Sequence, residues 1–287
     1  MTTAEKMERN HQKNLEIIKK FRLIDDTFMT QCFDGNIECI QLVLRIVMEM
    51  PDLMVISVHT QVFVGNMLNR AVRLDILATD SAGKKINVEI QRSDEGAGFK
   101  RARFNSSLID ARLLQKGEDF DALPEVYVVF ITENDVIGQG KPLYRIGRYI
   151  YDTEERFDDG SHIIYVNGAY RGETPVGKLM HDFFCPNPEE MYYEVLADRV
   201  KFFKESKEGV SVMCKLLEDR LKEEREEGRE EGREEGREEG LKEGQEKQMI
   251  ETAKRMLETK TFTLEMVSKF SGMPLNEVKK VQLELAL

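Results

Sequence analysis

The sequence has no long hydrophobic run and is poor in cysteine and histidine. No apolar stretch approaches the roughly 20 residues that span a bilayer, so we expect no integral membrane protein. The four cysteines and four histidines show neither C-x-x-C spacing nor clustering, which argues against a zinc site and a disulfide framework. The polar segment MTTAEKMERNHQKN lacks the apolar stretch of a secretory signal, and we therefore expect a cytoplasmic location.

A strong basic footprint is also missing. The formal net charge is −11, and residues 221–248, with twelve Glu and seven Lys or Arg, contribute −5 of it. An acidic metal centre would account for part of the remainder. No part of the chain carries a strong excess of positive charge, and this counts against tight nucleic-acid binding.

The chain does have enough residues, 287, for one large domain with appendages. Helical periodicity over residues 12–50 predicts two helices joined near 34–36. The period changes to two between Val72 and Gln91, around the turn-like residues 80–83, which predicts a β-hairpin.

A helical pattern at residues 97–116 precedes EVYVVFIT at 125–132, an apolar run typical of a strand in a sheet covered on both faces. Helix and strand together suggest a βαβ unit. The sequence predicts further strands within 143–151 and 162–166, and further helices near 176–184 and 189–205.

The composition changes after residue 205, where R-E-E-G recurs with a period of four. Each Gly in a helix costs about 1 kcal/mol relative to Ala, so a frayed, solvated helix or a flexible spacer is expected. The three apolar segments in residues 249–287 resemble a small helix-turn-helix. We therefore predict a domain at 1–205, a charged helical linker at 206–248 and a small helical segment at 249–287.

The expected hairpin has an apolar face and a polar face. On the polar face lie Asp75 of the first strand and Asn87, Glu89 and Gln91 of the second. Burying both apolar sets on one side places Asp75 opposite Glu89 or one diagonal away, with Cβ atoms roughly 5–8 Å apart. Two facing carboxylates repel, and a hard cation would relieve that repulsion.

A second interpretation of this face is the solvated side of an ordinary amphipathic hairpin. The following helix carries Lys100, Arg101 and Arg103, which could bind phosphate beside the carboxylates. An ordinary solvated helix face is the alternative for these three residues.

The order helix, D-x13-E-x-Q hairpin, helix, strand resembles that of the PD-(D/E)XK nuclease superfamily. Within it, the chain resembles the bacterial recombination-promoting nuclease and putative transposase family. The stretches that carry this resemblance are RLDILATDSAGKKINVEIQ, RARFNSSLIDARLLQKGEDF, VYVVFITENDVIGQGKPLY, HIIYVNG and MYYEVLADRVKFFKE, together with the Glu-Gly tail. The resemblance implies an α/β fold with a restriction-endonuclease-like core, a mixed central sheet flanked by helices.

The same resemblance implies that Asp75 and Glu89 ligate Mg²⁺, with Mn²⁺ as an alternative ion and the Ile90 main-chain carbonyl as a third ligand. Gln91 stands at the position of the superfamily's lysine, where it can orient the attacking water but brings no positive charge. Asp26 matches an acidic position on the first helix that completes such sites, with a helix N-cap as the alternative. Arg101 matches the family's basic position and would contact phosphate.

The implied reaction is metal-dependent hydrolysis of a DNA phosphodiester, in the setting of recombination or transposition. RNA also stays open as a substrate, because a metal-carboxylate centre does not by itself select the sugar. A noncatalytic adaptor that keeps the nuclease fold is the alternative function, favoured by the missing lysine and the weak basic footprint. The C-terminal helices could read DNA or serve packing and homo-oligomerisation.

Overall fold

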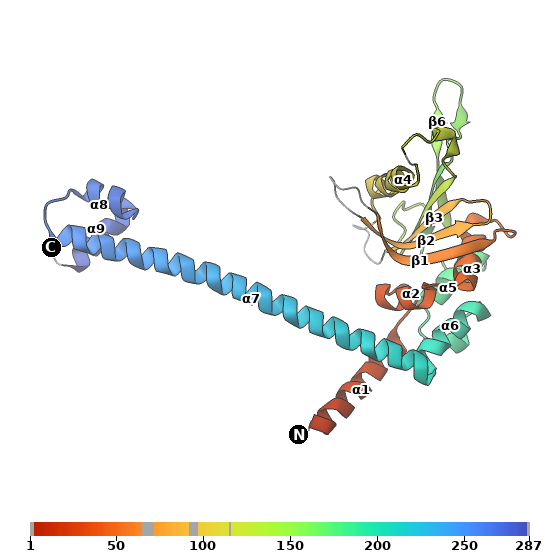
Figure 1. Ribbon diagram of the computed structural model, residues 1–287, viewed down its shortest axis with the longest axis horizontal. Helices are drawn as coiled ribbons and strands as arrows, with labels where there is room; N and C mark the ends of the chain where they lie inside the picture. Colours follow the sequence, from red (N-terminus) through yellow and green to blue (C-terminus); the bar gives the residue numbers. More distant parts are fainter. Residues whose placement is uncertain (1–2, 65–71, 92–96, 115, 286–287) are drawn as a thin grey trace. The chain divides into compact units, whose positions relative to one another are not determined.

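The computed structural model describes residues 3–64, 72–91, 97–114 and 116–285. The chain forms two compact units, Met1–Lys215 and Leu216–Leu287. The first unit is built on a six-stranded mixed sheet with helices on both faces (Figure 1). In sheet order the strands are β1 (Val55–Val64), β2 (Val72–Asp80), β3 (Lys85–Gln91), β4 (Val126–Thr132), β8 (Ser161–Asn167) and β5 (Leu143–Ile146).

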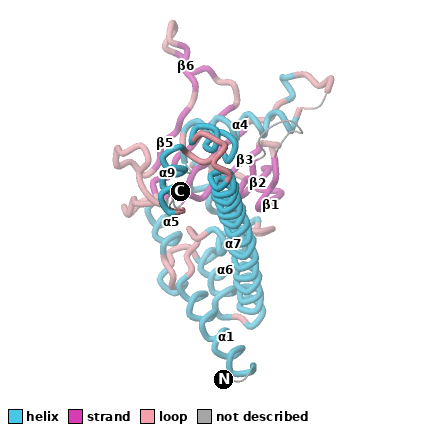
Figure 2. The backbone as a smooth tube through the Cα atoms, turned by 90° about the vertical axis from the view of Figure 1, so that its left-hand side faces the viewer, coloured by secondary structure: helices cyan, strands magenta, loops and turns pink. Residues whose placement is uncertain are grey.

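The directions of the strands follow from the connections between them. Strands β1, β2 and β3 pair antiparallel and lie side by side (Figure 2). Strand β3 pairs parallel with β4, with helix α4 (Phe99–Leu113) between them in the chain. The expected hairpin and βαβ unit are therefore present. Strand β8 continues the sheet in parallel with β4, and β5 closes it antiparallel to β8. A separate two-stranded sheet pairs β6 (Arg148–Ile150) with β7 (Glu155–Phe157).

Helices cover both faces of the sheet. Helix α4 lies on one face, and α2 (Asp26–Phe33), α3 (Ile37–Met48) and α5 (Pro175–Phe184) lie on the other (Figure 1). All seven residues of β4 are buried, as expected for a strand covered on both faces. Helix α6 (Glu194–Glu205) follows α5. The prediction of a mixed central sheet flanked by helices is confirmed.

The N-terminal helices differ from the expected pair. Helix α1 (Thr3–Lys20) ends before α2 begins, so three helices precede β1 where two were predicted. Oδ2 of Asp25 accepts a hydrogen bond of 2.8 Å from the main-chain N–H of Arg22, and Oδ1 pairs with the Arg22 guanidinium at 3.2 Å. A side chain that binds nearby backbone amides competes with helical bonding, which explains the interruption.

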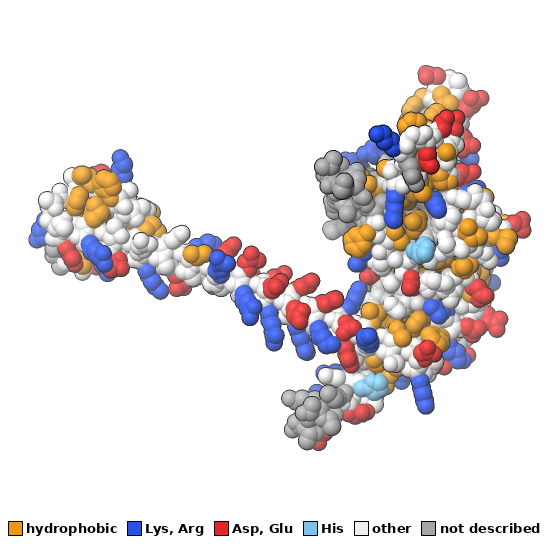
Figure 3. Space-filling view, in the orientation of Figure 1, with side chains coloured by type: hydrophobic (Ala, Val, Ile, Leu, Met, Phe, Trp, Pro, Cys, Tyr) orange, Lys and Arg blue, Asp and Glu red, His pale blue; other side chains and the backbone are white. Residues whose placement is uncertain are grey.

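Helix α7 runs without a break from Lys207 to Glu258. Along its exposed part, acidic and basic side chains form separate rows (Figure 3). Within the second unit, α8 (Leu264–Ser271) and α9 (Leu275–Glu284) pack with the last turns of α7 around Ala253, Val267 and Val278. Gly272 ends α8 with a left-handed φ of 76°, a conformation that glycine adopts without strain. No helix in the described ranges has the length and apolar character needed to cross a membrane.

Candidate active site

The candidate site lies where β2 and β3 stop pairing through their backbones. Their antiparallel register pairs Ile76 with Val88, so Asp75 comes opposite Glu89 one step further along. There the side chains take over the hydrogen bonds: Ile90 N–H donates to Asp75 Oδ2 at 3.0 Å, and Asp75 N–H donates to Glu89 Oε1 at 3.3 Å. The structure thus brings the two carboxylates together, in the arrangement that the hairpin's parity predicts.

Strand β1 is distorted at the same level. Thr60 pairs with Ile76 and Val62 pairs with Leu74, and Gln61 between them has a left-handed φ of 54°. Residues other than glycine rarely adopt this conformation, and such strain concentrates at functional sites. The irregularity lies directly opposite Asp75, so the sheet is locally irregular beside the carboxylate.

Burial makes both carboxylates hard to ionise. Desolvation raises the pKa of Asp75 to about 7, and the Glu89 charge adds to the increase, against a lowering by the Ile90 N–H. Desolvation also raises the pKa of Glu89, whose side chain has no exposed surface, while bonds from Asn87 and the Arg101 charge oppose the increase. A coupled pair of this kind favours binding of a proton or a cation.

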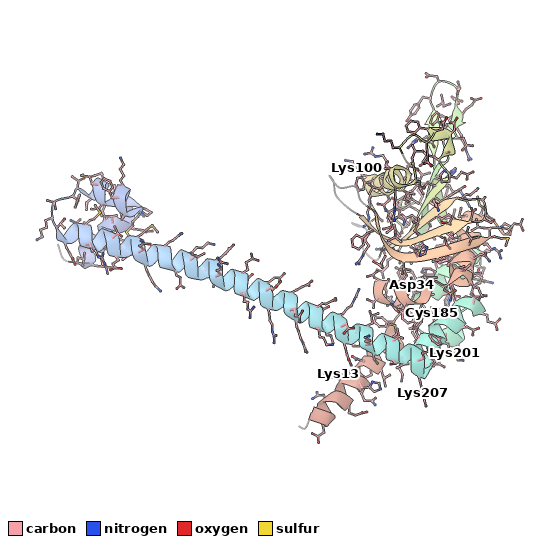
Figure 4. The ribbon with its side chains drawn as sticks, in the orientation of Figure 1. Lys13, Asp34, Lys100, Cys185, Lys201 and Lys207 are labelled. Atoms are coloured by element: carbon pink, nitrogen blue, oxygen red, sulfur yellow. The ribbon has the colours of Figure 1, made fainter. Side chains whose placement is uncertain are left out.

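Arg101 supplies a positive charge to the site from α4. Its Nη2 lies 2.8 Å from Glu89 Oε2, and its side chain is 37% exposed. The structure therefore places Arg101 beside the carboxylates. Arg101 was expected to contact a substrate phosphate, and here its guanidinium pairs with Glu89. Lys100 and Arg103 on the same helix are exposed, and Lys100 lies in the first turn of α4 (Figure 4).

Asp26 is the first residue of α2 and is exposed. Its charge is among those that raise the pKa of Asp75, so α2 brings this carboxylate close to the pair. The N-cap position belongs to Asp25, whose side chain makes no capping hydrogen bond. The N-cap alternative for Asp26 is therefore wrong.

The other two predicted site residues are the last of β3. Ile90 faces β2 with its main-chain N–H, and in an extended strand the carbonyl of the same residue points to the same side. The backbone of Gln91 pairs with Thr132 of β4. The side chain of Gln91 lies outside the part of the chain that the structure describes.

Two asparagines belong to the site and were not singled out from the sequence. Asn87 Nδ2 donates to Glu89 Oε1 at 3.0 Å and to the Ile76 carbonyl at 3.2 Å. Asn105, one helical turn after Arg101, places its Nδ2 3.5 Å from Asn87 Oδ1. The spacing of both residues gave a signal. Asn87 lies two residues before Glu89 and so shares its strand face, and Asn105 lies four residues after Arg101 and so shares its helix face.

The donor set fits a hard divalent cation. It consists of carboxylate and carbonyl oxygens, which Mg²⁺ and Mn²⁺ prefer, and Mg²⁺ commonly uses one or two protein carboxylates and keeps several waters. Within the described ranges, no group of three or more His, Cys, Asp or Glu side chains is arranged to hold a metal. A site here would therefore rely on Asp75, Glu89 and main-chain oxygen.

The mixed sheet with helices on both faces and a carboxylate pair on its central hairpin is the architecture of a PD-(D/E)XK nuclease-like core. Residues 54–169 match the family model described as PD-(D/E)XK nuclease family transposase. The matched stretch includes Asp75, Glu89 and Arg101 and leaves out Asp26. None of the curated proteins and none of the solved structures compared with the chain gives a match.

Proposed function

We propose that the first unit is a metal-dependent endonuclease that hydrolyses phosphodiester bonds in DNA. The observation that carries the proposal is the pair of half-buried Asp75 and fully buried Glu89, held together by two backbone-to-carboxylate hydrogen bonds. The family match supports a nuclease or transposase type of function, and nucleases of this superfamily generally use divalent metals. DNA is the substrate that the family implies, and recombination or transposition is the proposed setting.

Each residue of the site has a proposed role. Asp75 and Glu89 hold Mg²⁺ or Mn²⁺ with the Ile90 carbonyl, and Gln91 orients the attacking water. When bound, the metal supplies Lewis-acid stabilisation of the charge that develops on the phosphate, and it makes water more acidic. Arg101 contacts the substrate phosphate, for which its planar guanidinium is suited. Asp26 adds negative charge near the pair from α2.

Plasmid nicking tests the proposal. Purified protein is incubated with supercoiled DNA and Mg²⁺ or Mn²⁺, and the wild type is compared with Asp75→Asn and Glu89→Gln. We expect metal-dependent nicking by the wild type and a loss of at least about 100-fold in both variants, because each removes a charged ligand. Glu125→Gln is the control: its carboxylate pairs with Lys84 and Tyr127, outside the site, and should leave nicking unchanged.

A noncatalytic adaptor is the competing function, and one observation favours it. The Arg101–Glu89 ion pair already neutralises the buried carboxylate without a metal. A folded wild type that does not nick DNA or RNA with either ion, or variants that nick as well as the wild type, would make the adaptor the better account.

A further inference from the structure

Glu89 divides its partners between its two carboxylate oxygens. Oε1 accepts from the main-chain N–H of Asp75 and from Nδ2 of Asn87, both of which are fixed within the sheet. Oε2 accepts from Arg101, whose side chain is partly exposed. One oxygen is therefore anchored by the fold, and the other is bound by a group that can move away.

The Asn87 amide can adopt only one orientation. Its nitrogen faces two acceptors, Glu89 Oε1 and the Ile76 carbonyl, so a flipped amide would set oxygen against oxygen. Asn87 has no exposed surface, and an unsatisfied buried polar group costs about 1–3 kcal/mol. The two N–H bonds of Asn87 are thus fully used in linking β2 to Glu89.

Asn105 extends this chain of amides to α4. Because Asn87 presents its oxygen, Asn105 must present its nitrogen, and the distance between the two atoms is 3.5 Å. Asn105 is also completely buried, and its Oδ1 has no hydrogen-bond partner among the described residues. A buried amide that leaves its own oxygen unpaired in order to face Asn87 indicates that orienting Asn87 is what this position provides.

We propose that Asn87 and Asn105 are positioning residues that hold Glu89 by Oε1 and so present Oε2 to the divalent cation. This inference rests on the proposed metal-dependent function. Neither asparagine is a ligand: Asn87 acts on Glu89 directly, and Asn105 acts through Asn87. Groups that orient a metal's ligands typically change its affinity by about 10–100-fold when removed.

Binding of Mn²⁺ to the full chain, followed by calorimetry and by the electron paramagnetic resonance of free Mn²⁺, tests the inference. We expect Asn87→Ala to weaken Mn²⁺ binding by about 10–100-fold and Asn105→Ala to weaken it by a smaller factor. The matched control is Asn167→Ala. Asn167 is also buried at a strand end, and its side chain bonds only to the Lys141 carbonyl and the Ala169 N–H among the described residues.

Thermal melting separates positioning from general destabilisation. All three alanine variants should melt at lower temperature than the wild type, because each loses buried hydrogen bonds. Only the two variants near Glu89 should lose Mn²⁺ affinity. If Asn87→Ala fails to fold, Asn105→Ala carries the test, because it leaves the bonds to Glu89 in place.

The outcomes distinguish this inference from the proposed function. Wild type that binds Mn²⁺, with both variants binding equally well, overturns the positioning role alone. An equal loss in Asn167→Ala also overturns it. Wild type that does not bind Mn²⁺ overturns the inference together with the metal-dependent function. Mn²⁺ binding that depends on Asn87, in a protein that cuts no nucleic acid, supports the positioning role and rejects the nuclease.

Discussion

Arg101 donates a 2.8 Å hydrogen bond to Oε2 of Glu89, so a partly exposed cation from α4 neutralises a carboxylate that has no exposed surface. A divalent cation bound to Oε2 would compete with this ion pair. Released from Glu89, the guanidinium would remain beside the site and would be available for a phosphate. The same residue can therefore balance the charge of the metal-free site and contribute to substrate binding.

Arg101→Ala should lower both the stability of the metal-free protein and the affinity for DNA. Without Arg101 the buried Glu89 carboxylate has no counter-charge, which lowers the free energy of unfolding. Because Arg101 is partly exposed, we expect this loss to be about 1–3 kcal/mol. Thermal melting and the KM of nicking measure the two effects. Arg103→Ala is the stability control, because Arg103 is exposed on the same helix. Equal melting temperatures for the two variants would contradict the role given to the ion pair.

The stability of the metal-free protein should depend on pH through Asp75. The folded-state pKa of about 7 lies above the ordinary aspartate value, so between roughly pH 4 and pH 7 the folded protein binds a proton that the unfolded chain does not. The contribution of Asp75 to the free energy of unfolding is therefore present at low pH and is lost as the pH rises through about 7. Asp75→Asn should therefore stabilise the metal-free protein by on the order of 2 kcal/mol at pH 8 and by much less at pH 4.

Melting curves in the presence of a chelator, at both pH values, measure this effect. Addition of Mn²⁺ at pH 8 should raise the melting temperature of the wild type and leave that of Asp75→Asn nearly unchanged. A stabilisation by Asp75→Asn that is the same at pH 4 and pH 8 would argue against a raised Asp75 pKa.

Alanine in the glycine repeat of α7 should make that helix more stable. An added Cβ at Gly228, Gly232 or Gly236 meets no atom within 4 Å, and Ala is favoured over Gly in an exposed helix by about 1 kcal/mol per residue. Far-ultraviolet circular dichroism during heating measures the gain. Gly209→Ala is the matched control in the same helix: its Cβ would lie 2.2 Å from the Phe202 carbonyl oxygen, so it should destabilise the protein.

Replacing the two exposed lysines of α9, Lys279 and Lys280, should leave DNA affinity unchanged. The helix also carries Glu277 and Glu284, so it presents no excess of positive charge. Fluorescence anisotropy of a labelled duplex over a range of salt concentrations tests this. A loss of affinity that is the same for different DNA sequences would instead favour a DNA-binding role for the C-terminal helices. In that case the slope of log affinity against log salt concentration should become shallower by about one for each lysine removed.

The hairpin and its register were predictable because β3 alternates strictly between apolar and polar residues and β2, before its last residue, does so with the single exception of Leu77. Strand β1 was not predicted from the sequence. Its exposed face carries Ile56 and Phe63, and His59, Thr60 and Gln61 interrupt the apolar pattern in between. The pairing with β2, rather than local alternation, holds this segment extended.

The polar face of the hairpin is covered at Asn87 and Glu89, whereas the alternative interpretation expected this face to be solvated. Glu89 and Asn87 have no exposed surface, because α4 covers them. A single sequence indicates which residues share a strand face. Which turn of α4 meets that face depends on packing between elements, so the contacts of Arg101 and Asn105 could not be derived from spacing alone.

The four-residue repeat of α7 has a consequence for variation in the length of the chain. Each R-E-E-G unit adds about 6 Å of helix and slightly more than one helical turn, at 3.6 residues per turn. Inserting or deleting one unit removes no buried side chain, since the repeat residues are exposed. Insertion or deletion of whole R-E-E-G units should therefore change the length of α7 at little energetic cost.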